Sequence, residues 1–419
     1  MAHELNMDLP QFDYFLKPVF QKTVDRDVVT EQRPSTLVNS ENSLVFEFNL
    51  AENEYLLFNE SYLYVRAKVI LAKGTDEIKK DHFKKITPAN YLLNTMFRQA
   101  NVEIDGYPVC NTAVNFMYKA HLEALLAYSE DAKTSHLTAA LWEPEDDERS
   151  KRLREGGEFE MMGRIHFDLT HQMRAFPGGH KVKISLELNK PAFLFTSTET
   201  GLTASIKFSN AHLDIRRAIL SSQALKEIKH KCLKNPICLP LVRSRVRAFP
   251  IPKDSVDLPF EDVTRGALPR RIFFTMVKSE AYNGSFGHDA FNYEHFNLNY
   301  LACYIDGVQY PSRAYTPDFT NDHYAREYIG LIQALNQNNT DSYANISYED
   351  FKNTPIFGFN FTPDLTNGDI LGPLNPPKQG TLRFQVAFKE ALTVPVTALV
   401  YMEFDSNISI EQNNIKCLN

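Results

Sequence analysis

The stretch FRQANVEIDGYP, from Phe97 to Pro108, carries the pattern that decides the fold. An alternating apolar segment ends there in Ile-Asp-Gly, and an aromatic residue and a proline follow the turn. Asp-Gly between two such segments indicates a tight β-hairpin, because both turn residues must accept positive φ. A second copy, YLACYIDGVQYP, runs from Tyr300 to Pro311 and places Asp306 201 residues after Asp105. A repeat of about this length is therefore expected.

Three further landmarks recur in the same order at nearly the same spacing. They are a helical segment after each hairpin, a segment that begins with glycine and reaches Asp-Leu, and an alternating strand pattern. The matched segments are Tyr118–Tyr128 with Tyr324–Leu335, Gly163–Leu169 with Gly358–Leu365, and Val182–Leu188 with Leu382–Phe388. Together they predict a duplicated domain, and a chance recurrence of generic strand patterns is the alternative.

Composition and periodicity favour strands in both halves. Aromatic residues make up 12% of the 419 residues, mostly Phe and Tyr, which pack well on a pleated face. Strict alternation begins at Leu44, and the first half holds about eight strand candidates and one helix. Jelly rolls use eight strands in two Greek keys. The sequence therefore predicts an all-β chain of two tandem eight-stranded jelly rolls, a double jelly roll with short inserted helices.

The predicted boundaries follow from where the alternation starts and stops. They are an N-terminal arm at 1–40, a first jelly roll at 41–220, a connector at 221–240, a second jelly roll at 241–410 and a C-terminal tail at 411–419. The arm has no clean period and mixes prolines with Phe12, Tyr14, Phe15 and Phe20. These aromatic side chains could anchor the arm to a neighbouring subunit or a membrane surface, or could cover its own domain.

Arg243, Arg245 and Arg247 follow a lysine-rich connector at a spacing of two residues. In a strand, this spacing places three positive charges on one face. We therefore expect these arginines to form a subunit contact or to meet an acidic inner partner. An ordinary solvated strand face is the alternative.

Charge and cysteine content limit the functions that the chain can have. A net charge of −7 argues against a coat for nucleic acid, because neutralising phosphates takes a surplus of Lys and Arg, and no direct sequence-specific contact with nucleic acid is expected. The five cysteines form no CxxC pair and are odd in number, so neither a zinc cluster nor a complete disulfide framework is implied. Residues 1–19 lack the apolar core of a signal peptide, and no apolar run is long enough to span a bilayer.

No catalytic or cofactor-binding motif is present in the sequence. There is no GxxxxGK loop, no GxGxxG after a strand, and neither HExxH nor GxSxG. His288, Asp289 and His295 cluster, but a third strong metal ligand with suitable spacing is missing, so a surface loop is the better interpretation. His166 and His171 lie at spacings that suggest no common face. We therefore expect no enzyme activity, no cofactor and no metal.

Five blocks of sequence resemble the hexon-like proteins of Polinton (Maverick) elements and adintoviruses. The blocks cover most of the chain, from about residue 40 to 410, and keep a specific order and spacing. They are NYLLNTMFRQANVEIDG (Asn90–Gly106), YKAHLEALLAYSEDAKTSHLTAALW (Tyr118–Trp142), MMGRIHFDL (Met161–Leu169), LPRRIFFTMVKSEAYNGSF (Leu268–Phe286) and YEHFNLNYLACYIDGVQYP (Tyr293–Pro311).

This resemblance implies a double jelly-roll major capsid protein, in the lineage shared with virophages and adenoviruses. In that family three copies form a homotrimeric capsomer of pseudo-hexagonal outline, and capsomers tile an icosahedral shell. The implied partners are neighbouring capsomers, penton or minor capsid proteins and, where one is present, an inner membrane. The implied location is the virion shell, assembled inside the host cell. The family has no catalytic residues to transfer.

Three other readings of the sequence stay open at this point. A domesticated jelly-roll binding module would be a monomer with a ligand pocket. A minor, penton-type capsid protein would need only one jelly roll. A cupin-type enzyme would carry a metal, and the histidine spacing argues against it.

Overall fold

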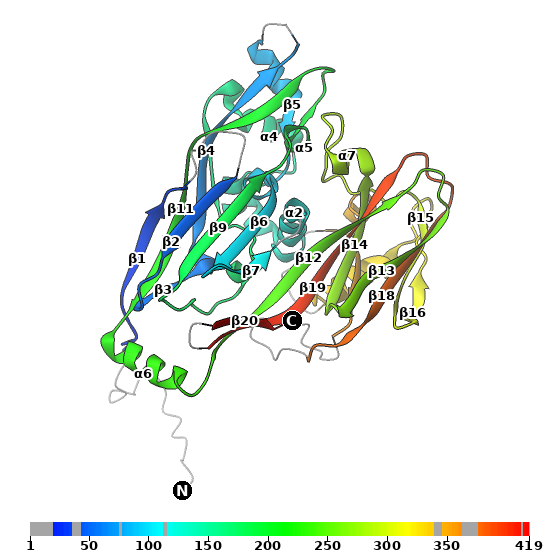
Figure 1. The fold of residues 1–419 in the computed structure, drawn as a ribbon. Helices are drawn as coiled ribbons and strands as arrows, with labels where there is room; N and C mark the ends of the chain where they lie inside the picture. Colours follow the sequence, from blue (N-terminus) through cyan, green and yellow to red (C-terminus); the bar gives the residue numbers. More distant parts are fainter. Residues whose placement is uncertain are drawn as a thin grey trace, which may run out of the picture.

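The computed structural model describes residues 20–35, 43–74, 78–111, 115–338, 346–362, 376–411 and 414–418. These residues form two jelly rolls that lie side by side, each made of two antiparallel sheets (Figure 1). Within the described ranges, no helix is long and apolar enough to cross a membrane.

The first jelly roll pairs a β1-β11-β4-β8 sheet with a β2-β9-β6-β7 sheet. Its strands are β1 (Val24–Gln32), β2 (Leu44–Asn49), β3 (Glu54–Leu56), β4 (Tyr62–Ala72), β5 (Ile86–Pro88), β6 (Phe97–Ile104), β7 (Tyr107–Asn111), β8 (Phe159–Gly163), β9 (Lys181–Leu188), β10 (Phe195–Ser197) and β11 (Thr203–Leu220). The short β3 extends the first sheet, and β5 pairs with β10 in a separate ribbon.

The second jelly roll pairs a β12-β19-β14-β17 sheet with a β13-β18-β15-β16 sheet. Its strands are β12 (Ile237–Ile251), β13 (Asp257–Ala267), β14 (Arg271–Lys278), β15 (Leu298–Ile305), β16 (Val308–Tyr315), β17 (Phe357–Asn360), β18 (Gln379–Phe388), β19 (Val396–Glu411) and β20 (Asn414–Leu418). If the eight principal strands of each half are counted in chain order, both halves have the same two sheet orders. The predicted duplication and the double jelly-roll fold are confirmed.

The helices lie in the connections between strands. They are α1 (Leu92–Thr95), α2 (Phe116–Ala127), α3 (Glu130–Thr134), α4 (Asp146–Arg152), α5 (Pro191–Leu194), α6 (Ser222–Cys232), α7 (Ser279–Asn283), α8 (Ala325–Ala334) and α9 (Asp350–Asn353). Short 3-10 turns are η2 (Phe58–Glu60), η3 (Lys80–Lys85), η4 (His136–Ala140), η5 (Arg154–Gly156) and η6 (Asp168–His171). The two helices expected after the hairpins are α2 and α8.

The two Asp-Gly hairpins form as predicted. Asp105 and Gly106 turn between β6 and β7 with φ of 52° and 83°, and Asp306 and Gly307 turn between β15 and β16 with φ of 49° and 83°. Each aspartate also accepts a hydrogen bond from the next strand of its sheet. The bonds are Lys181 N to Asp105 Oδ1 at 2.8 Å and Thr381 N to Asp306 Oδ1 at 2.8 Å. Each hairpin thus fixes the register of a third strand.

These turns give a stability prediction with a matched control. We expect Gly307→Ala to destabilise the chain by about 1 kcal/mol, because L-residues other than Asn and Asp avoid positive φ. A Cβ at Gly307 would meet no heavy atom within 4 Å, so the cost comes from the backbone alone. Gly287→Ala is the control, since its Cβ would make only ordinary contact, 3.7 Å from Ser285 Oγ. Urea unfolding of both variants measures the difference, and equal stability would contradict the turn argument.

The helix α2 joins the two jelly rolls. Nearly all of its side chains are buried, and it contacts β6 of the first jelly roll and β12 of the second. Figure 1 shows it between the two pairs of sheets. By contrast, α8 packs on β17 and β14 of its own half. A helix that is buried on all sides needs packing partners on every side, and the junction of the two jelly rolls supplies them for α2.

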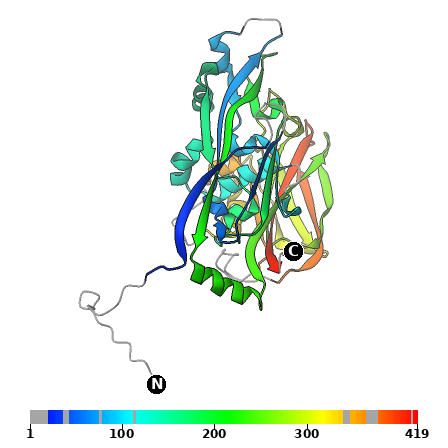
Figure 2. The ribbon, with the colours of Figure 1, turned by 60° about the vertical axis from the view of Figure 1, so that its left-hand side comes forward.

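The observed boundaries differ from the predicted ones at three places. The predicted arm at 1–40 contains β1, which pairs with β11 as the edge strand of the first jelly roll (Figure 2). The predicted connector at 221–240 holds α6 but also the first residues of β12, and the predicted tail contains β20, which pairs with β19. β1 and β20 are edge strands, and β1 has no fully buried side chain, so it shows little apolar alternation.

Candidate functional site

The three arginines predicted as a subunit contact lie along one face of β12. They alternate with Ser244 and Val246, which are buried. Arg243 Nη2 donates to the carbonyl oxygen of Val109 in β7 at 3.1 Å, so it links the second jelly roll to the first within one chain.

Arg245 and Arg247 extend this face toward the second jelly roll. Arg247 Nη1 donates to the carbonyl oxygens of Asp262 and Val263 in β13 at 2.9 and 2.6 Å. The Arg245 guanidinium is exposed and lies 5.9 Å from the centre of the Phe404 ring. Arg243 and Arg247 therefore donate hydrogen bonds to other strands of the same chain, whereas the exposed Arg245 lies beside the Phe404 ring. Their role between subunits stays a prediction.

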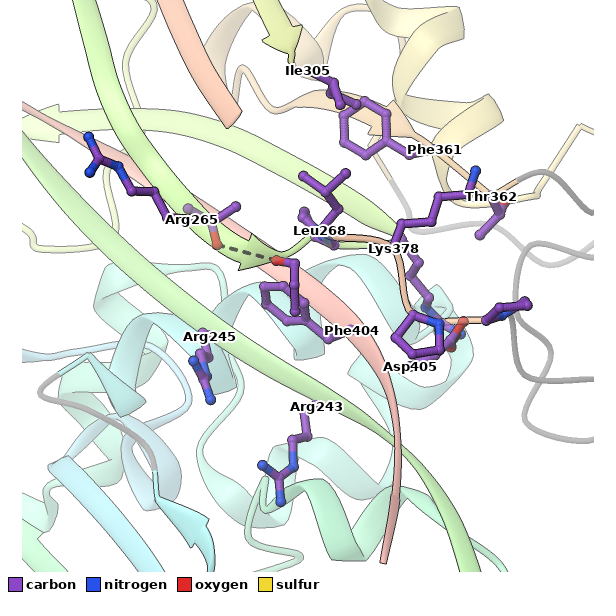
Figure 3. A pocket seen from close by; sticks show the side chains of 16 residues that line it. Arg243, Arg245, Arg265, Leu268, Ile305, Phe361, Thr362, Lys378, Phe404 and Asp405 are labelled. Atoms are coloured by element: carbon purple, nitrogen blue, oxygen red, sulfur yellow. Dashed lines mark hydrogen bonds and ion pairs between the residues drawn. The ribbon is translucent and has the colours of Figure 1, made fainter. Parts of the chain in front are cut away.

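Arg243 and Arg245 also line a cavity of about 370 Å³ at one end of the second jelly roll (Figure 3). The cavity lies between β12, the end of β13, the middle of β19, the β13–β14 connection and the β15–β16 hairpin. Its apolar wall includes Leu268, Phe361 and Phe404.

Positive charge dominates the lining of this cavity. Five cationic side chains, Arg243, Arg245, Arg265, Arg270 and Lys378, stand against one carboxylate, Asp405. Arg270 is held by Glu403 and Asp405, and Arg265 by Asp262. In the part of the chain that the structure describes, Arg245 and Lys378 form no ion pair with a carboxylate. The cavity thus presents unneutralised positive charge beside aromatic and aliphatic surface.

A buried polar network joins α2 to both jelly rolls. Lys119 Nζ lies 3.2 Å from Glu123 Oε1 and 3.1 Å from Asp168 Oδ1, and it donates to the carbonyl oxygen of His166 at 2.5 Å. From the second jelly roll, Ser244 Oγ donates to Glu123 Oε1 at 2.6 Å. The side chains of Lys119, Glu123 and Asp168 are at most 8% exposed. A buried ion pair of this kind is tolerated only when its remaining hydrogen-bonding capacity is also satisfied.

The network continues through Tyr401 into β19. The Tyr401 hydroxyl lies 3.2 Å from Glu123 Oε1 and 3.1 Å from Glu403 Oε1. Glu403 in turn binds Arg270 at 3.2 Å and also contacts Arg271. Burial raises the pKa of the Tyr401 hydroxyl, and the neighbouring carboxylates raise it further. Tyr401 therefore stays protonated and acts as a hydrogen-bond donor between two carboxylates.

Glu123 holds two imidazoles on its other oxygen. His166 Nδ1 lies 2.9 Å and His171 Nε2 3.1 Å from Glu123 Oε2. Burial lowers the pKa of His166 to about 4, although the hydrogen bond to Glu123 opposes the shift. Neutral His166 donates from Nδ1, so Nε2 accepts from the Tyr91 hydroxyl at 2.9 Å. Burial alone would raise the pKa of Glu123, but Lys119 and the two histidines outweigh it and hold that pKa well below its usual range.

Glu123, His166 and His171 have the ligand types of a metal site, and their ligand atoms lie within 4.8 Å of one another. Yet each imidazole already has a satisfactory hydrogen bond to the carboxylate, and Lys119 supplies a cation beside it. A second cation would have to overcome the repulsion of that ammonium group in a poorly solvated site. The arrangement is therefore suited to hold structure rather than to bind a metal.

The other histidine cluster is not assembled. His288 Nε2 lies 3.5 Å from Glu280, Asp289 accepts from the Phe291 amide at 2.9 Å, and His295 stacks on Phe319. The three side chains thus have separate partners.

Sequence reasoning missed the network that includes His166 and His171. The prediction that these histidines share no common face considered strand periodicity alone, whereas Glu123 on α2 brings them together. One available signal was the pair Lys119 and Glu123, four residues apart in a predominantly apolar helix. Charges in such a helix either point to solvent or pair in the interior.

Comparison with known sequences finds a distant relative of almost the same length. F54H12.2, an uncharacterized protein of Caenorhabditis elegans, is 27% identical over 405 residues, which cover 90% of this chain and 94% of that protein. No protein-family model matches the sequence.

Solved structures show the same fold at very low sequence identity. The Sputnik virophage structure matches 99% of this chain and 93% of its own with a TM-score of 0.63 and 10% identity. The Faustovirus major capsid protein matches 97% and 93% with a TM-score of 0.62 and 8% identity. The mavirus major capsid protein matches 100% and 94% with a TM-score of 0.53 and 10% identity. The described residues therefore have the double jelly-roll fold found in these viral major capsid proteins.

Proposed function

We propose that the chain is a hexon-like major capsid protein of a double-stranded DNA virus or virus-like transposon. The observation that carries the proposal is the pair of jelly rolls with identical sheet orders, held side by side by α2. Three such chains around an axis present six similar lobes, and a six-lobed unit tiles a closed shell. The full-length likeness to viral major capsid proteins supports this function.

The proposal includes the finer lineage and partners. The five sequence blocks resemble Polinton and adintovirus proteins, and the chain would occupy the virion shell. Its partners would be two further copies in a trimer, neighbouring capsomers, penton or minor capsid proteins and, where present, an inner membrane. Within the trimer, the flanks of the jelly rolls and the face of β12 that carries Arg243, Arg245 and Arg247 would form the contacts between copies.

The mass of the purified chain in solution tests this function. We expect light scattering to give three times the chain mass of 48.0 kDa, because each copy exposes two different lobes that close a ring with their neighbours. Negative-stain images of the same peak should show a pseudo-hexagonal outline. A monomer at all concentrations would overturn the proposal and favour a jelly-roll binding module, whereas a pentamer would indicate a penton-type protein.

A further inference from the structure

The basic cavity of the second jelly roll has a chemistry that restricts what it can bind. Arg245 and Lys378 are exposed at its rim, and Arg265 adds a third exposed cation that pairs with Asp262. Phe404 and Phe361 give it an aromatic wall. A volume of about 370 Å³ lies at the small end of ligand pockets, enough for a few side chains. Its complement is a short segment that carries carboxylates next to aromatic side chains.

One segment of the chain outside the described residues has this composition. Residues 1–19 read MAHELNMDLPQFDYFLKPV and contain three carboxylates against a single lysine. The carboxylates are Glu4, Asp8 and Asp13, and the aromatic residues Phe12, Tyr14 and Phe15 surround the last of them. We propose that this segment of one copy occupies the basic cavity of a neighbouring copy.

The start of β1 and the cavity lie at the same end of the molecule, which allows this contact. Residue 20 leads into β1, whose first residue, Val24, pairs with Leu220 just before α6. In Figure 1 this end of β1, α6 and β20 all lie at the same end of the molecule as the closed hairpin of β15 and β16 beside the cavity. A segment of 19 residues can span at most about 65 Å when extended. The proposed contact therefore requires the neighbouring copy's cavity to lie within this distance of residue 20.

The choice of a neighbouring copy rests on the proposed function. β1 is the outer edge of the first jelly roll, on the side away from the second (Figure 1). In a closed ring of two-lobed chains, the first lobe of each copy meets the second lobe of the next, because the interface is head to tail. The segment that precedes β1 therefore starts beside the next copy's second jelly roll.

Electrostatics and apolar contact have separate roles in this contact. Exposed charge pairs contribute little each and are screened by salt. Aromatic side chains against Phe404 and Phe361 supply the apolar part, which salt does not screen. The contact should therefore weaken, but not vanish, as ionic strength rises.

A cross-linking experiment on the full chain tests the inference. Phe15 is replaced by the photoreactive p-benzoylphenylalanine, and light and isotope-labelled copies are mixed before irradiation. We expect cross-links between light and heavy copies that map to the cavity, next to Phe404 or Lys378. The double variant Arg245→Glu with Lys378→Glu should lower their yield about tenfold. Adding Asp8→Lys and Asp13→Lys to it should restore much of the yield.

The control changes the same charge outside the cavity. Lys226→Glu with Lys231→Glu alters two exposed lysines on α6 and should leave the yield unchanged. A trimer of normal mass whose cross-links map elsewhere, lie within one copy, or ignore the reversal at Arg245 and Lys378 overturns this inference and leaves the capsid proposal intact. A chain that stays monomeric overturns both.

Discussion

Replacing Lys119 with methionine is expected to destabilise the chain by about 3 to 5 kcal/mol, because it leaves two buried carboxylates without their cation. The lysine lies 3.2 Å from Glu123 and 3.1 Å from Asp168, and all three side chains are almost completely buried. Methionine preserves most of the volume, so the loss of charge dominates. Urea denaturation followed by circular dichroism measures the free energy of unfolding.

A cross-strand ion pair on the surface provides the control for this substitution. Lys183 lies 3.2 Å from Glu103, and about a third of each side chain is exposed. Lys183→Met should cost less than about 1 kcal/mol, because water compensates the remaining carboxylate. Equal effects at Lys119 and Lys183 would show that the buried network does not hold the two halves together.

Acid should destabilise the chain through two buried histidines. Burial lowers the pKa of His166 to about 4 and that of His121 to about 3, against 6.5 for an ordinary histidine. The unfolded chain therefore binds more protons than the folded one below pH 6.5, so stability is lost as the pH falls through that value. Between pH 7 and 5 the loss is about 2 kcal/mol for each histidine. Unfolding free energies measured across this range test the slope.

Single substitutions identify which histidine causes the dependence of unfolding free energy on pH. His166→Gln removes one of the two titrating groups, so it should flatten the dependence between pH 7 and 5 even if it lowers stability at every pH. His230→Gln replaces an exposed histidine on α6 and should leave the slope unchanged. A slope that is insensitive to His166 would mean that this imidazole does not stay neutral in the folded chain.

The parts of the fold that depend on local chemistry could be predicted from the sequence. Asp-Gly turns require two residues at positive φ, and the sequence marked both hairpins, Asp105-Gly106 and Asp306-Gly307. The repeated order of landmarks then gave the duplication. β1 was missed for a local reason as well. It is an edge strand whose side chains are exposed or only half-buried, so the alternation that reveals a strand is faint.

The candidate site could be predicted less well, because its members are far apart in the sequence. Tyr401 and Glu123 are 278 residues apart, and Ser244 and Glu123 are 121 apart. No short sequence pattern indicates a contact between residues so far apart. Likewise, the spacing of Arg243, Arg245 and Arg247 correctly indicated one strand face, but not that Arg243 bonds to β7 or that Arg245 borders a cavity.

The helix α2 also makes the relative orientation of the two jelly rolls rigid. Since it is buried against both jelly rolls and bonded to each through Glu123, the angle between the lobes cannot change without breaking buried hydrogen bonds. The two jelly rolls therefore move as one rigid body. If such chains build a shell, the curvature of that shell must arise from changes of angle at the interfaces between copies, because bending within a copy would break buried hydrogen bonds.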